Sequence, residues 1–438
     1  MNSRVLRISN ASLLTGIAIG VVGGAFRYLL IAADHLRDWL IFRAHAQPLV
    51  GWLAPVALGL AGAAVARWLV VRFAPEAEGS GVQRVEAVFS GEIKPGRNTI
   101  VPVKFVGGLL AIGSGLALGR EGPTVQMGAS LAALVSRWLV KDPQDGKVVE
   151  AAGAGAGLAV AFNAPIGGSI FVFEELTASF TPWLLVATLA AASVAVWLMR
   201  LMLGNSLSFS VHLVSLTERW RLGPFLVVGA LMGVCGALYN WITMVLLRLS
   251  DRLARFSSIQ RAAAIGAVVG LTAWFAPHLV GGGDSLTQAI LSDRYTIEGL
   301  ATVFALRFLI GPWSYTAGTP GGIFAPLLVL GASLGGLVGA VLHHLNPTLE
   351  ITSVACAVVG MASLFTASVR APLTGIVLTV EMTGRGDLTL GLLAASLVAL
   401  VVTMLLNSKP IYESLKRRML EQQLKVEANA KARTSFVR

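Results

Sequence analysis

Long stretches without Asp, Glu, Lys or Arg constrain the fold of this chain more than any other feature. A helix of about 20 apolar residues crosses the roughly 30 Å of hydrocarbon in a bilayer. The uncharged stretches near or above that length are 151–173, 222–247, 262–283, 308–349, 351–369 and 388–408. Only 13% of the residues are charged, against about 25% in soluble domains. We therefore predict an all-α polytopic membrane protein with at least ten membrane segments, two of them within 308–349.

The net charge of +11 is placed where membrane orientation would need it. Eight basic and three acidic residues lie in 409–438, which predicts a C-terminal helix and basic tail on the cytoplasmic side of the cell (inner) membrane. Anionic membrane lipid accounts for these charges, and without basic-aromatic modules we expect no nucleic-acid partner. The apolar run after Arg7 is too long for a signal peptide, so we expect it to be the first structural helix.

The two cysteines, Cys235 and Cys356, lie far apart in apolar segments. This spacing predicts neither a disulfide framework nor a zinc site. We expect no metal and no cofactor.

The chain contains an internal repeat. Residues 123–131 read PTVQMGASL, and residues 326–334, which follow 203 positions later, read PLLVLGASL. Ala164, Pro165, Gly168 and Glu174 recur 207 positions later as Ala371, Pro372, Gly375 and Glu381. Such repeats, with discontinuous helices and usually inverted topology, are typical of transporters. We predict one domain, 1–438, built from repeats at about 50–205 and 222–408.

The repeat separates structural residues from functional candidates. Residues that recur in both halves, such as Glu174 and Glu381, are expected to serve packing or backbone capping. Two carboxylates have apolar counterparts instead: Glu121 corresponds to Phe324, and Glu175 corresponds to Met382. These two glutamates are the better functional candidates.

Three glycine-rich turns precede apolar helices, at 79–81, 119–123 and 321–326. Glycine allows close approach of the backbone, and helix N-termini attract anions without a full positive charge. The turns therefore suggest an anion site, although simple helix breaking is the alternative. Glu121 could occupy the anion position as a gate that protonation releases; its alternative is an ion pair with Arg120.

Further candidates come from two other segments. Glu174 or Glu175 could be a second proton station, with a solvated helix end as the alternative for Glu175. The Tyr412 hydroxyl could complete an anion site, with an interfacial tyrosine as the alternative. The segment 331–335 fits G-x-S-x-G, which would suggest an intramembrane serine enzyme. Because GASL occurs in both halves, we prefer helix packing and expect no enzyme.

These motifs resemble the CLC family of chloride channels and proton-coupled chloride transporters. The resemblance is carried by GSGVQ at 79–83, GREGP at 119–123, NAPIGGSIFVFEE at 163–175, GGIFAP at 321–326 and Tyr412. It implies a homodimer in which each subunit has its own ion path. It also implies that the Ser80 and Tyr412 hydroxyls and the backbone N–H groups of Ile323 and Phe324 bind chloride, with Ser80 favouring chloride over nitrate. Glu121 would be the gating glutamate and Glu175 the internal proton-transfer glutamate.

Within this family, Glu175 favours chloride/proton antiport, because channel relatives usually have a non-acidic residue there. A passive voltage- or pH-gated chloride channel is the alternative. Gln83 departs from the family pattern, which has proline at that place, so a less rigid start of the following helix is expected. Eukaryotic relatives carry nucleotide-binding CBS pairs, which we do not expect in a chain of this length.

Overall fold

The computed structural model describes residues 2–211, 222–253, 255–347 and 352–435, and in these ranges nearly all regular structure is helical. Before the gap at 212–221 the helices are α1 (Asn2–Ala44), α2 (Leu53–Phe73), α3 (Val82–Phe89), α4 (Ile100–Gly113), α5 (Glu121–Leu139), α6 (Pro143–Phe162), α7 (Pro165–Phe171) and α8 (Pro182–Leu203). After it they are α9 (Gly223–Arg252), α10 (Ser258–Phe275), α11 (Asp284–Leu291), α12 (Ile297–Tyr315), α13 (Phe324–Leu345), α14 (Ser353–Val369), α15 (Pro372–Thr383), α16 (Thr389–Leu405) and α17 (Ile411–Ser435). A π-helical turn, η2 (Val172–Leu176), continues α7.

The membrane prediction is confirmed in outline and corrected in one place. Among the described residues, seven helices are long and apolar enough to cross a membrane, and three apolar helices, α4, α14 and α15, are shorter. The stretch 308–349 does not form two passes: it supplies the last turns of α12 and the whole of α13, and residues 348 and 349 lie outside the described residues. A glycine-rich turn at 318–322 interrupts it, which keeps the chain in the interior instead of completing a second span.

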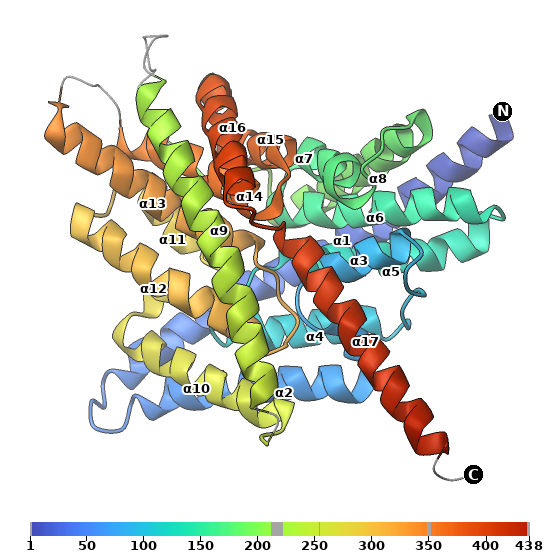
Figure 1. Cartoon of the computed structure of the whole chain (residues 1–438), viewed down its shortest axis with the longest axis horizontal. Coiled ribbons are helices and arrows are strands. Elements are labelled where there is room, and N and C mark those ends of the chain that lie inside the picture. The colour runs from blue at the N-terminus through green and yellow to red at the C-terminus, as the bar shows by residue number, and fades with distance from the viewer. Residues whose placement is uncertain (1, 212–221, 254, 348–351, 436–438) are drawn as a thin grey trace.

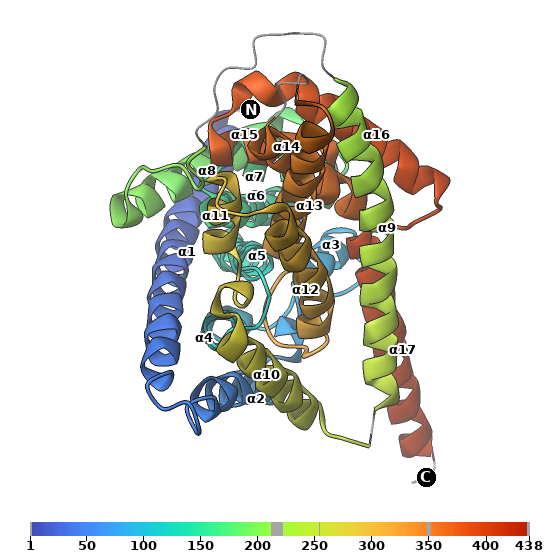
Figure 2. The same ribbon diagram turned by 90° about the vertical axis from the view of Figure 1, so that its left-hand side faces the viewer.

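Helices from the two halves pack closely together (Figure 1). The first segment is a structural helix, as predicted: α1 packs against α8 and α6. Helices α2 and α10 lie side by side, as both views show (Figures 1 and 2). The predicted C-terminal helix is also present, since α17 begins beside α3 and extends past the end of α9 (Figure 2). Arg438 of the basic tail lies outside the described residues.

Equivalent residues set helix ends in the two halves. Helix α3 follows Gly81, which has φ +90°, and α11 follows Gly283, which has φ +96°. These are left-handed conformations that glycine adopts without strain. Helices α7 and α15 begin with Pro165 and Pro372, where a missing N–H costs nothing. The two halves therefore break their helices at matching places.

The repeated GASL motif lies in helix packing, as the repeat suggested. Gly128 of α5 lies against the backbone of Gly153 in α6, and Gly331 of α13 lies against Gly360 in α14. A Cβ atom at either Gly128 or Gly331 would collide with the facing carbonyl oxygen. Small residues thus let each helix pair approach closely.

Candidate functional site

The three glycine-rich turns meet in the interior, where α3, α5 and α13 begin. Gly119 and Gly322 exchange two backbone hydrogen bonds of 2.7 Å each. The Gly321 N–H donates to the Gly79 carbonyl at 3.1 Å. Segments more than 200 residues apart are thereby joined at one point, and the N-termini of two long helices face each other there.

Glu121 is fully buried at the first residue of α5 and points at the start of α13. Its Oε2 accepts a hydrogen bond from the Ala325 N–H at 3.4 Å, and its Oε1 has no partner. The alternative of an ion pair with Arg120 is wrong, because Arg120 pairs with Asp284 and donates to the Ala161 carbonyl. The carboxylate therefore lies where free N–H groups and the positive end of the α13 dipole attract an anion.

Two hydroxyl groups lie close to the same helix starts. The hydroxyls of Ser80 and Tyr412 are buried and have no hydrogen-bond partner among the described residues. The ring of Tyr412 lies 6.0 Å from that of Phe324, measured between centroids. Because Tyr412 is fully buried, the alternative of an interfacial tyrosine is wrong.

Backbone donors at the start of α13 complete this group. Ile323 and Phe324 are the N-cap and first residue of the helix, and both are fully buried. Neither N–H donates a hydrogen bond to a described residue. Two hydroxyls and two free amides converging in an apolar interior form a set that can solvate a small anion without a cation.

Sequence reasoning missed a buried lysine that shapes the Gly79–Gly81 turn. Lys104 of α4 is fully buried, and its Nζ donates to the carbonyls of Gly79 at 2.6 Å and Ser80 at 3.0 Å. From α12, the Tyr315 hydroxyl accepts the Ser80 N–H at 3.3 Å. Together these contacts fix the backbone around the Ser80 hydroxyl.

The second half uses a similar arrangement. Arg307, 203 residues after Lys104, is buried and donates to the carbonyls of Leu279, Gly281 and Gly282 before α11. The shared offset of two basic residues in apolar segments is a signal that could have identified both of them.

Glu174 and Glu381 cap each other's repeat, which confirms that these matched residues serve backbone capping. The Glu174 carboxylate accepts the N–H groups of Leu373 at 3.0 Å and Thr374 at 2.7 Å, at the start of α15. Glu381 accepts those of Ile166 at 3.1 Å and Gly167 at 2.6 Å, at the start of α7. Since both oxygens of Glu174 are engaged, Glu175 is the better candidate for a proton station.

Glu175 lies apart from the group around Glu121, in a cavity of about 610 Å³ near the start of α17. Glu86, Glu92 and Lys416 line the same cavity, and the Lys416 Nζ pairs with Glu86 at 2.6 Å and with Glu92 at 3.2 Å. A larger cavity of about 1090 Å³, also lined by α17, reaches Gly79, Gln83 and Tyr315. The two cavities adjoin each other along α17, since Glu92, Leu420 and Leu424 line both.

Gln83 does not displace the start of its helix. Helix α3 begins at Val82, directly after Gly81, and the Gln83 side chain is buried.

The enzyme hypothesis receives no support from the geometry. Ser333 lies inside α13, where its hydroxyl donates to the Leu330 carbonyl at 3.1 Å, and not on a strand-to-helix turn. Both cysteines are buried and free, in α9 and α14. Within the described ranges, no three His, Cys, Asp or Glu residues are grouped closely enough to hold a metal ion.

Known proteins resemble the whole of this architecture. The "H(+)/Cl(-) exchange transporter ClcA" of Vibrio cholerae serotype O1 is 38% identical over 424 residues, covering 94% of this chain and 89% of that protein. The protein of the same name from Citrobacter koseri is 32% identical over 428 residues, covering 95% and 90%.

Solved structures agree with these sequence relatives. A slow cyanobacterial Cl⁻/H⁺ antiporter superposes with a TM-score of 0.91 at 33% identity, covering 95% of this chain and 99% of that one. A CLC-type fluoride/proton antiporter shares the fold, with a TM-score of 0.77 at 23% identity, covering 92% and 96%. The family model described as "Voltage gated chloride channel" matches residues 62–404. This chain belongs to that family, the CLC proteins, and is a multi-pass membrane protein.

Proposed function

We propose that this protein exchanges chloride for protons across the membrane. The observation that carries the proposal is the placement of the two unmatched carboxylates. The Glu121 carboxylate lies against the amides at the start of α13, and Glu175 lines a cavity beside α17 that Glu121 does not line. A channel for chloride alone would need the first of these groups and not the second. The names of the sequence relatives and of the cyanobacterial structure support exchange.

In this proposal the chloride ion is held by the hydroxyls of Ser80 and Tyr412 and by the N–H groups of Ile323 and Phe324. These groups are buried donors without other acceptors. The partial positive charges of these hydroxyl and N–H groups suit the passage of chloride, because the ion must bind weakly enough to be released. The cavity that reaches Gly79 and Tyr315 would carry chloride to this point.

Glu121 acts as the gate. While ionised, its carboxylate competes with chloride for the N-terminus of α13. Protonation neutralises the side chain and removes that competition, so chloride can occupy the N-terminus of α13 while Glu121 carries a proton. Glu175 then exchanges the proton with the cytoplasmic solution through the cavity that it lines.

We extend the proposal to the location, orientation and oligomeric state of the protein. The protein lies in the cell (inner) membrane in contact with lipid, with α17 and the basic tail in the cytoplasm, where positively charged segments stay. It is a single domain of two inverted repeats, at about 50–205 and 222–408, which the reciprocal contacts of Glu174 and Glu381 support. As the family resemblance implies, it forms a homodimer. A measurement of the molecular mass of the protein in detergent tests this.

The decisive experiment follows chloride efflux and external pH together in liposomes that contain the purified protein and no proton shunt. Chloride efflux should drive proton uptake. Glu175→Gln should abolish proton movement while chloride still passes, because the amide cannot carry a proton. Glu174→Gln is the matched control, since that residue caps a helix, and it should keep the chloride/proton ratio. Chloride flux without proton movement in the unchanged protein would contradict exchange and support a passive channel.

A further inference from the structure

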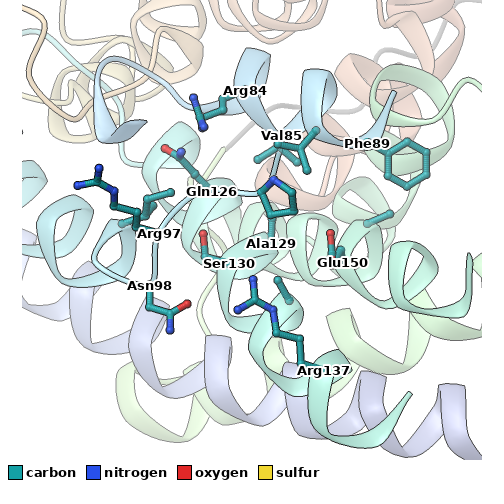
Figure 3. A pocket seen from close by; sticks show the side chains of 16 residues that line it. Arg84, Val85, Phe89, Arg97, Asn98, Gln126, Ala129, Ser130, Arg137 and Glu150 are labelled. Atoms are coloured by element: carbon teal, nitrogen blue, oxygen red, sulfur yellow. The ribbon is translucent and has the colours of Figure 1, made fainter. Parts of the chain in front are cut away.

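A small basic pocket lies between α3, α5 and α6, and the proposed transport path does not use it (Figure 3). Three arginines from three segments line it: Arg84 of α3, Arg97 of the loop before α4, and Arg137 near the end of α5. Glu150 of α6 is the one carboxylate among the lining residues. The pocket therefore carries a surplus of positive charge.

This positive charge is poorly compensated inside the protein. In the described part of the chain, Arg84 and Arg137 form no ion pair within 4.0 Å, and Arg97 reaches Glu76 only at 3.8 Å. The Nε of Arg84 is buried and has no hydrogen-bond partner. A buried donor without an acceptor is costly, so the Arg84 Nε indicates a ligand that accepts hydrogen bonds.

The chemistry of the lining selects the class of ligand. The planar guanidinium fork matches the oxygens of phosphate, and the Asn98 amide and Ser130 hydroxyl add neutral donors. The cavity volume is about 60 Å³, which has room for a few water molecules or one phosphate group and not for a whole nucleotide. Val88 and Ile100 provide an apolar wall beside these polar groups.

The position of the pocket suits a lipid headgroup. Trp138 follows Arg137 and is 89% exposed. Exposed tryptophans collect at the level of lipid headgroups, where basic pockets between membrane helices bind anionic lipids. We propose that this pocket binds a phosphate group, either that of an anionic lipid headgroup or free inorganic phosphate.

The test measures binding and does not depend on transport. Native mass spectrometry in detergent compares phosphatidylglycerol with phosphatidylcholine, and thermal unfolding compares inorganic phosphate with chloride at equal ionic strength. Binding of phosphatidylglycerol alone identifies a lipid headgroup as the source, and binding of inorganic phosphate identifies the free ion. Absence of both from the unchanged protein would overturn the proposal.

Variants of the lining residues test whether binding occurs in this pocket. Arg84→Gln and Arg137→Gln should each weaken binding about tenfold, the effect of losing one charge-assisted contact. Glu150→Gln should tighten binding, since it removes the one negative charge. Arg248→Gln is the matched control, because Arg248 is an exposed arginine that lies outside the pocket. Equal binding by the control and the Arg84→Gln/Arg137→Gln double variant, with both folded by circular dichroism, would also overturn it.

Discussion

The two halves of the molecule break their helices at the same places but carry different groups there. At the start of α5 the first half has Glu121, whereas at the start of α13 the second half has Phe324, which packs against Phe365 with centroids 4.5 Å apart. Likewise Glu175 lines a cavity, and its counterpart Met382 is fully buried. By contrast, Glu174 and Glu381 form equivalent contacts. The matched carboxylates therefore maintain the fold, and the unmatched carboxylates are the candidates for chemistry.

The largest expected effect comes from removing the proposed gate. With Glu121→Gln, chloride flux should become independent of pH between about 4.5 and 7.5, because the amide does not titrate. The unchanged protein should vary about tenfold over that interval, since protonation of one group sets the fraction of open sites. Chloride efflux from liposomes at a series of pH values measures this. Glu381→Gln is the control from the other half, and retained pH dependence in Glu121→Gln would break the assignment.

A second comparison concerns the buried cations Lys104 and Arg307. Each substitution to Met should lower the free energy of unfolding by about 3 kcal/mol, because buried carbonyls lose charged donors. Lys104→Met should also reduce chloride flux, since Lys104 holds the turn that carries Ser80, whereas Arg307→Met should reduce only stability. Chemical unfolding and chloride efflux give the two readouts. Equal loss of flux per folded protein would show that both turns serve transport.

The reciprocal caps allow a sharper test of symmetry. Glu174→Ala and Glu381→Ala should each cost about 1–2 kcal/mol, the usual cost of losing a helix cap. The two values should agree within about 0.5 kcal/mol, because each carboxylate accepts two N–H groups. Unfolding of both variants in one detergent provides the measurement. A clearly larger loss for Glu174→Ala would mean that the Thr374 hydroxyl, which Glu174 also accepts, dominates its cap.

The smallest effect concerns the start of α17. Burial lowers the pKa of Lys416, but its hydrogen bond and ion pair with Glu86 raise it more, so the net pKa is raised. Because the pKa of Lys416 is higher in the folded state, its protonated form stabilises the fold below about pH 10.4. This contribution is lost as the pH rises through the folded-state pKa of Lys416. Proteolysis of α17 should thus be unchanged between pH 6 and 9 and should accelerate only above about pH 10.4.

A control separates the contribution of the Lys416 ion pairs from a general loss of α17 packing at alkaline pH. Lys416→Met should be cleaved faster at every pH, whereas Arg417→Met should not, because among the described residues Arg417 pairs only with Glu421 on its own helix. An alkaline step that persists in Lys416→Met would contradict the assignment to Lys416.

The local features of the site were predictable from the sequence, and its long-range contacts were not. Short sequence segments are enough to recognise the glycine turns, the prolines that begin α7 and α15, and the residues that repeat between the halves. They were sufficient to single out Glu121 as a candidate and to predict capping for Glu174, whose contacts confirm it. The partner of Glu174 and the position of Tyr412 depend on how separate helices pack, which no local pattern encodes. Arg120 shows the limit: its sequence neighbour Glu121 suggested an ion pair, but Asp284 from the other half takes that place.

The exchange of carboxylates between α7 and α15 has a consequence for how such a chain can arise. Glu174 serves the second half as Glu381 serves the first, which is the self-complementary pattern of a twofold-symmetric dimer interface. Two identical copies of one half could form both contacts before any sequence divergence. Fusion of two such copies into one chain would preserve the interface and allow each copy's other residues to change independently. The asymmetry between Glu121 and Phe324 is therefore a specialisation that two identical copies could not acquire.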